Sequence, residues 1–317
     1  MAGIGYALAS EDWPPRDLVA LARRAEESGF EYAFISDHIH PWVDKQGSSS
    51  FVWGVLGGIA EATERLRLAT GVTCPLIRIH PVIVAHAAAT AACLMRGRFF
   101  LGVGTGENLN EHVLGHRWPA PDERVEMLKE AIDIMRLLWK GGEQTHRGKH
   151  YTVDHCRIYD LPDDPIDIAV AAGKPVAATL AGQLGDALIN TAPDREVAES
   201  FEEAGGKGKP KYGMLHVCYS EDEEEARRTA HELWPNLALG GSLGQELPRP
   251  QDFEAAAELV THEDVAETVP CGPDADRHRQ AIKEYEDAGY DHVFIHQIGP
   301  DQEAFFRFYE SEILARV

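Results

Sequence analysis

Short apolar runs and amphipathic segments alternate along the whole chain. The first pair sets the pattern. Residues 4–8 predict a buried strand, and the helix face that follows carries Leu18, Leu21, Ala22 and Ala25 at the spacing of one buried face and ends at Gly29. Further strands are predicted at residues 32–36, 66–72, 98–103, 166–171, 187–191, 212–219 and 291–297. Further helices are predicted at about residues 51–63, 82–95, 122–140, 194–203, 221–233, 262–267 and 274–288, after Pro175, and from Pro300.

This alternation predicts a (β/α)8 TIM barrel rather than a doubly wound sheet. No linker interrupts it, so we expect residues 1–317 to form a single domain. Residues 150–159 alternate like an extra hairpin or surface strand. Between about residues 234 and 262 the periodicity is lost over a length too great for an ordinary connection, which predicts an insertion covering one end of the fold.

Composition narrows the possible partners and compartment. Acidic residues outnumber basic ones by 52 to 30, and the resulting formal charge of −22 opposes binding to nucleic acid or anionic lipid. The five cysteines show no CxxC spacing, so neither a disulfide framework nor a zinc–cysteine site is indicated. No apolar run reaches the length of a membrane span, and no leader pattern is present at the start. We expect a cytoplasmic protein that binds a small-molecule substrate.

Side chains able to carry chemistry gather just after the predicted strands. Asp37, His38, His40 and Trp42 follow the second strand within six residues. An isolated Asp-His pair often only caps a turn. In a barrel, however, active sites lie on the loops after the C-terminal ends of strands, so the position favours function. The same ends carry Thr73-Cys74, Gly104 to Asn110, Gly173-Lys174 and Thr191.

Two glycine-containing loops are candidates for contact with a cofactor. In residues 104–108 the missing side chains allow backbone amides to approach a planar ring or an anion. A plain tight turn is the alternative explanation. The spacing is not GxGxxG, which disfavours a Rossmann dinucleotide site. Residues 171–175 are able to present amides to a phosphate at a helix start.

The segments 36–38 with 41–42, 100–107 with 109–110, and 168–173 together resemble the luciferase-like flavin and deazaflavin oxidoreductases. Within that family the chain is similar to the glucose 6-phosphate dehydrogenases that use coenzyme F420. The resemblance implies a homodimer, a cis peptide at Gly71-Val72, and a deazaflavin held at the C-terminal ends of the strands. The cofactor contacts that it implies are Glu11, Asp37, Cys74, Thr105, Gly106, Asn110, Gly173, Lys174, Val176 and Ala177.

The same resemblance implies that His38 and Glu107 form the catalytic pair and that Trp42 packs on the reaction centre. A histidine suits removal of a hydroxyl proton in alcohol oxidation, or its donation in carbonyl reduction. A carboxyl group near the ring suits control of charge on the reduced cofactor. The expected reaction is F420-dependent hydride transfer with an alcohol or carbonyl substrate.

The substrate end departs from the family pattern. The sugar-phosphate enzymes bind phosphate with two lysines and an arginine, whereas the matching places here hold Thr191, only Arg249 in the insertion, and no basic residue in 265–270. We therefore predict that Thr191 contacts a substrate other than glucose 6-phosphate. Lys207, Lys209 and Lys211 offer an alternative source of phosphate contacts, although lysines in such a turn are more often simply solvated.

Three other functions are considered. One is an FMN-dependent monooxygenase with the same fold. Another is a metal-dependent hydrolase, because His38 and His40 alternate as in some barrel hydrolases. Against a hydrolase, the motif follows the second strand rather than the first, and His216, His292 and His296 are assigned to structural or surface positions. The third is a cofactor-binding or storage protein without turnover, which retention of both His38 and Glu107 disfavours.

Overall fold

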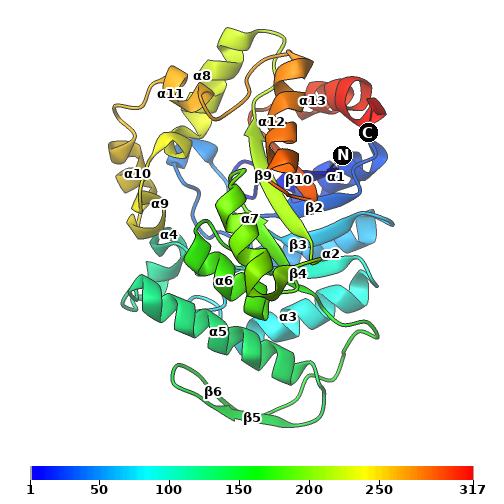
Figure 1. Ribbon diagram of the computed structural model, residues 1–317, viewed down its shortest axis with the longest axis vertical. Coiled ribbons are helices and arrows are strands. Elements are labelled where there is room, and N and C mark those ends of the chain that lie inside the picture. Colours follow the sequence, from blue (N-terminus) through cyan, green and yellow to red (C-terminus); the bar gives the residue numbers. More distant parts are fainter. Residues whose placement is uncertain (1, 317) are drawn as a thin grey trace.

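The computed structural model describes residues 2–316, and within this range eight parallel strands close into a barrel (Figure 1). The strand order is β1-β10-β9-β8-β7-β4-β3-β2, which confirms the predicted (β/α)8 architecture. Most predicted strands are right to within two residues at each end. The barrel strands are β1 (Gly3–Leu8), β2 (Tyr32–Ile35), β3 (Arg67–Thr70), β4 (Phe99–Val103), β7 (Ile168–Ala171), β8 (Ala187–Asn190), β9 (Lys211–Val217) and β10 (His292–Gln297).

Helices surround the barrel, and several begin with proline. Pro15, Pro81, Pro121 and Pro175 occupy the first helical turn, where a missing N–H costs no hydrogen bond. The helices are α1 (Pro15–Glu27), α2 (Val52–Ala62), α3 (Pro81–Leu94), α4 (Asn108–Glu111), α5 (Pro121–Leu138), α6 (Pro175–Leu184), α7 (Arg195–Phe201), α8 (Glu223–Leu233), α9 (Leu243–Glu246), α10 (Pro250–Ala256), α11 (His262–Ala266), α12 (Ala275–Asp287) and α13 (Gln302–Phe308). Among the described residues, no helix is long and apolar enough to cross a membrane.

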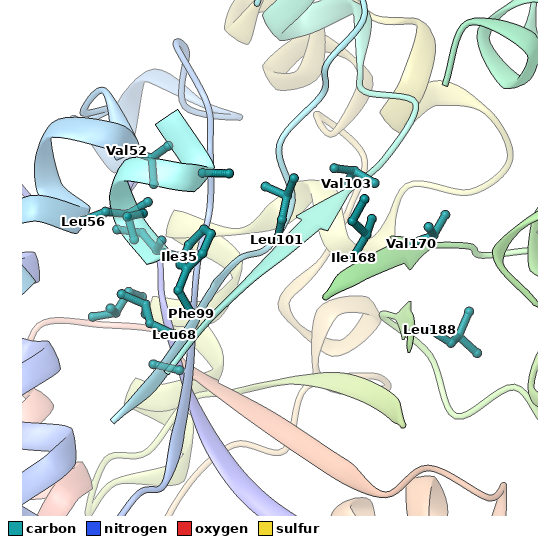
Figure 2. Packing of buried hydrophobic residues seen from close by; sticks show 14 of the residues in the cluster. Ile35, Val52, Leu56, Leu68, Phe99, Leu101, Val103, Ile168, Val170 and Leu188 are labelled. Atoms are coloured by element: carbon teal, nitrogen blue, oxygen red, sulfur yellow. The ribbon is translucent and has the colours of Figure 1, made fainter. Parts of the chain in front are cut away.

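The core has two layers. Between the barrel and its helices, strand side chains such as Ile35 and Phe99 pack against Val52 and Leu56 of α2 (Figure 2). Inside the barrel, aromatic rings fill the space, with Phe34 stacked on Phe294 and Phe100 stacked on Tyr212. These rings occupy the middle of the barrel, and a cavity lies beyond them, toward the C-terminal ends of the strands.

Two segments lie outside the barrel. β5 (Gln144–Arg147) and β6 (Thr152–Cys156) form an antiparallel hairpin, visible at the bottom of Figure 1. The sequence predicted only its second strand, because the first is entirely polar and lacks an apolar alternation. Residues 234–262 contain a 3₁₀ turn (Pro235–Ala238), α9 and α10, and α9 lies against α4 (Figure 1). These helices were not predicted, because a helix of two turns or fewer is too short to show a hydrophobic periodicity.

A pair of glycine substitutions tests how closely β3 and β4 approach. A Cβ on Gly102 would lie 1.9 Å from the Thr70 carbonyl oxygen, so Gly102→Ala requires backbone movement. We expect it to lower the free energy of unfolding by about 2 kcal/mol or more, measured by urea denaturation. Gly57→Ala, in α2, meets no atom within 4 Å and is expected to stabilise by about 0.5–1 kcal/mol. Equal effects of the two substitutions would contradict this account.

Candidate active site

A cavity of about 440 Å³ lies at the C-terminal ends of the barrel strands. Its floor includes Phe34 and the Gly71-Val72 peptide, which is cis as expected. Its outer wall is formed by residues of the segment 234–262, including Trp234 and Phe253. Volumes of this size, with mostly apolar walls and a few polar groups, are typical of small-molecule sites.

Glu11 and His38 form an ion pair in the cavity wall. The first follows β1 and the second follows β2, and these strands pair with Leu8 opposite Ile35, so each residue lies three positions beyond a matched pair. His38 Nδ1 lies 3.0 Å from Glu11 Oε1, at an angle that makes the contact an ion pair rather than an aligned hydrogen bond. Ser36 Oγ donates a 2.6 Å hydrogen bond to the other carboxylate oxygen of Glu11. The carboxylate is therefore fixed from two sides.

This pairing sets the charge of both side chains. Burial alone lowers the pKa of His38, but Glu11 and, more weakly, Glu107 overcome it and raise that pKa to about 9. Burial alone raises the pKa of Glu11, yet His38 and Ser36 lower it to about 2. At neutral pH the pair is therefore an imidazolium and a carboxylate. In the free protein His38 is better suited to donate a hydrogen bond than to accept a hydroxyl proton.

Glu107 and Trp42 complete the surroundings of His38. Glu107 Oε2 lies 4.0 Å from His38 Nε2, and its side chain is partly exposed to the cavity. The Trp42 ring meets the His38 ring edge to face at 5.1 Å, and on its other side it meets Phe253 at 5.2 Å. Trp42 thus links the histidine to the outer wall and limits water around it.

Three predicted site residues lie behind the cavity wall. Asp37 accepts a 2.7 Å hydrogen bond from Thr73 Oγ1 and a 2.9 Å bond from Arg78 Nη2. Asn110 accepts a 2.9 Å hydrogen bond from the backbone of Ile39, which fixes the loop that carries His38. Cys74 packs directly beneath Gly106, where an added Cβ would lie 2.5 Å from the Cys74 sulfur.

The remaining predicted residues fall into two groups. Lys174, Val176 and Ala177 stand at the start of α6 and do not line the cavity; Val176 is 80% exposed. Gly173 does line it, and a Cβ there would meet no atom within 4 Å, so this loop leaves an open face for a planar ligand. Every assignment of a role to these residues remains a prediction. The predicted residues that line the cavity are Glu11, His38, Trp42, Thr105, Gly106, Glu107, Gly173 and Thr191.

A second polar cluster, not predicted from the sequence, lies on β9 and β10. His216 and His296, which we had assigned to structural or surface positions, both line the cavity. They face each other in the register of β9 and β10, and their Nδ1 atoms lie 2.8 Å apart. Behind them, Asp12 lies 3.2 Å from His296 Nε2 and accepts hydrogen bonds from Trp234 Nε1. The sequence feature that could have identified His216 and His296 as site residues is their position near the C-terminal ends of two predicted strands.

No lysine or arginine is found among the described residues that line the cavity. Lys211 is the first residue of β9, at the opposite end of the barrel, and pairs with Glu202 at 2.8 Å. Lys209 donates to the carbonyl oxygens of Gly182 and Gly185. These two lysines are therefore engaged elsewhere. A phosphate dianion would find no fixed positive charge in the walls other than that of His38.

The outer wall is attached to the barrel through a buried arginine. Arg124 of α5 donates 3.2 Å hydrogen bonds to Glu246 Oε1 and to Gln245 Oε1, and its guanidinium lies 4.3 Å from the centre of the Trp118 ring. Gln245 itself lines the cavity. The cation thus ties the short helix α9 to α5, and Asn108 Nδ2 of α4 donates a further 3.0 Å hydrogen bond to the Glu246 carbonyl oxygen.

The two alternating histidines of the sequence motif separate in space. His38 turns toward Glu11 and Glu107, whereas His40 Nδ1 lies 3.0 Å from the Leu109 carbonyl oxygen and does not line the cavity. Among residues 2–316, no group of three or more His, Cys, Asp or Glu side chains is arranged to hold a metal ion. The hydrolase alternative requires His38 and His40 to bind the same metal ion, and these two side chains do not converge.

Comparison with known proteins gives consistent matches. Residues 3–292 match the model of the luciferase-like monooxygenase family. The chain is similar to the F420-dependent glucose-6-phosphate dehydrogenases of Beutenbergia cavernae (37% identity, covering 100% of this chain and 98% of the relative) and Nocardia farcinica (35%, 99% and 97%). Among solved structures it resembles an F420-dependent secondary alcohol dehydrogenase in complex with an F420-acetone adduct, with a TM-score of 0.92 and 28% identity over 99% of this chain and 98% of that one.

The charge of His38 gives a direct test of this geometry. Replacing Glu11 with Gln removes the main interaction that raises the pKa of His38, so that pKa should fall from about 9 to below its ordinary value of 6.5. In the wild type the raised pKa stabilises the fold fully below about pH 6.5, and this contribution disappears as pH rises through about 9. Histidine NMR titration measures the shift. Glu143→Gln, at an exposed carboxylate, is the control; an unchanged His38 titration in Glu11→Gln would contradict the pairing.

Proposed function

The chain belongs to the luciferase-like monooxygenase family, and from this we propose that it is a coenzyme F420-dependent oxidoreductase that transfers a hydride between the deazaflavin ring and an uncharged alcohol or carbonyl compound. Its relatives named above are F420-dependent dehydrogenases. Their similarity extends over nearly the whole chain, including the segments that build the cavity.

The observation that carries the substrate proposal is the absence of lysine and arginine side chains from the described lining of the cavity. The walls near His38 are instead apolar, with Trp42, Trp234, Leu237 and Phe253. A phosphate dianion loses its hydration in such a site, where His38 is the one cationic side chain among the described lining residues able to offer a charge-assisted hydrogen bond. A small neutral alcohol or ketone has only one polar atom to satisfy. We therefore assign a substrate other than glucose 6-phosphate.

The residues present fit a planar deazaflavin. The cis Gly71-Val72 peptide, the loop from Gly104 to Glu107, and Gly173 offer faces without bulky side chains, and Thr105 and Gly106 present backbone groups to the same space. When bound, the deazaflavin supplies the hydride acceptor in oxidation or the hydride donor in reduction. Glu107 lies where it faces the cofactor space and adds negative charge beside His38.

The protein's own groups then act on the substrate oxygen. The His38 imidazolium donates a hydrogen bond to that oxygen and stabilises the negative charge that develops on it. Glu11 keeps His38 protonated and fixes the ring through its Nδ1 atom, which leaves Nε2 for the substrate. Trp42 packs over the reaction centre, orients His38 and excludes water.

The proposal extends to the cellular setting. We propose that the chain functions as a homodimer, as the family resemblance stated from the sequence implies. We place it in the cytoplasm, as its scattered cysteines favour, with no nucleic-acid partner, as its charge of −22 favours. Light scattering of the purified protein reports the oligomeric state.

The first experiment measures binding of F420 and of FMN by fluorescence titration. We expect F420 to bind and FMN to bind at least tenfold more weakly; a preference for FMN would instead indicate a flavin monooxygenase. With F420 bound, small neutral secondary alcohols are expected to be oxidised, and glucose 6-phosphate to react at least 100-fold more slowly in kcat/KM. Comparable rates with the two substrate classes would refute the substrate assignment.

Substitution of the pair closest to the reaction tests their roles. His38→Gln and Glu107→Gln are each expected to lower kcat by roughly 100-fold or more, while the control His86→Gln, at an exposed position on α3, leaves it unchanged. Steady-state kinetics by loss of F420 absorbance measures both. Wild-type turnover in His38→Gln would remove this residue from the mechanism.

A further inference from the structure

Two of the three imidazoles that line the cavity, those of His38 and His216, are in opposite charge states. His38 is held as an imidazolium by Glu11. His216, on β9, has no carboxylate within hydrogen-bonding distance among the described residues, and burial together with the neighbouring His296 lowers its pKa to about 3. Oxidation of an alcohol by hydride transfer requires a group that accepts its hydroxyl proton. A protonated His38 is a poor acceptor, whereas a neutral imidazole is a good one.

We propose that His216, held in place by His296 and Asp12, accepts the hydroxyl proton of the substrate during alcohol oxidation and returns it during carbonyl reduction. This inference rests on the proposed function. It assigns His216 as a catalytic residue, because it borders the substrate space, and His296 and Asp12 as positioning residues behind it.

The contacts of His216 leave one ring nitrogen for the substrate. Its Nδ1 lies 2.8 Å from His296 Nδ1, a distance that requires one proton shared between the two rings. Its Nε2 makes no hydrogen bond to any residue in the described part of the chain and belongs to a side chain that lines the cavity. With Nδ1 protonated and donating to His296, Nε2 is an acceptor that faces the ligand.

The rest of the cluster can hold the transferred proton. His296 Nε2 lies 3.2 Å from Asp12 Oδ2, and Trp234 Nε1 donates to the same carboxylate at 3.1 Å. When a proton arrives at His216 Nε2, the proton on Nδ1 moves to His296 Nδ1, and the resulting imidazolium faces the Asp12 carboxylate. The other charged or titratable groups beside this cluster are Glu11, whose charge acts on both His216 and Asp12, and Tyr6, which lies near Asp12.

The reaction balances with these groups alone and the bound cofactor. In oxidation the substrate O–H bond breaks and its proton passes to His216 Nε2, while the carbinol C–H bond breaks and its hydride, with both electrons, passes to the oxidised deazaflavin. The carbonyl double bond forms, and its oxygen keeps the hydrogen bond from His38. Reduction follows the same path in reverse, so His38 stays protonated throughout both directions.

Kinetics of three variants test the assignment. His216→Gln keeps a polar side chain that cannot take up a proton and is expected to lower kcat for a neutral secondary alcohol by roughly 100-fold, with the F420 dissociation constant unchanged and KM within a few-fold. Asp12→Asn removes the charge that stabilises the His296 imidazolium. It is expected to lower kcat about tenfold and to move the acidic limb of the pH profile to lower pH, a shift that a purely structural role would not produce. His292→Gln, at the start of β10 and away from the cavity, is the matched control with kcat within twofold.

Nitrogen-15 NMR of the histidine-labelled, cofactor-free wild type gives an independent measurement. At pH 7 we expect His216 to be neutral with an unprotonated Nε2, and His38 to be an imidazolium. An imidazolium at His216 would overturn the proposal, as would wild-type kcat in His216→Gln when the wild type is active. Absence of any F420-dependent turnover by the wild type would instead refute the proposed function.

Discussion

The ion pair between Glu11 and His38 is the interaction on which the site depends. Placing an imidazolium and a carboxylate in a nearly dry wall is unfavourable unless each has a close partner. The barrel meets this requirement through register, because β1 and β2 pair side by side and deliver the two residues at the same height. Ser36 satisfies the remaining carboxylate oxygen. A positive charge is thereby fixed in a cavity whose described walls carry no lysine or arginine.

Strand register also explains why His216, unlike His38, is neutral. His216 and His296 are directly paired on β9 and β10, but the Asp12 carboxylate contacts His296 Nε2 rather than His216. One imidazole is therefore charged and the other neutral. The surroundings of each histidine therefore decide its role: His38 donates a hydrogen bond, and His216 accepts a proton.

Much of this arrangement was predictable from the sequence, because it follows from periodicity and from the position of strand ends. The barrel, the loop that carries His38, and the glycine loops were predicted in this way. The pairing of Glu11 with His38 was not, since it requires the strand order. Two further contacts were not predictable from the sequence: the Asp37 carboxylate turns toward Arg78, and His216 approaches His296. Side-chain direction depends on contacts between distant segments, which the sequence does not give. The short helices α9 and α10 lack the length that makes a pattern recognisable.

The attachment of the outer wall through Arg124 has an evolutionary consequence. The charged pair and the glycine loops belong to the barrel, whereas Trp234, Leu237, Gln245 and Phe253 belong to the segment that closes the cavity from outside. Arg124 and Asn108 hold that segment through α9, and Trp234 holds it through Asp12, so the apolar lining residues Leu237 and Phe253 can diversify while the barrel frame stays intact. Exchange of residues 235–262 between related proteins, with Trp234 retained on Asp12, would then transplant substrate preference onto an unchanged hydride-transfer centre.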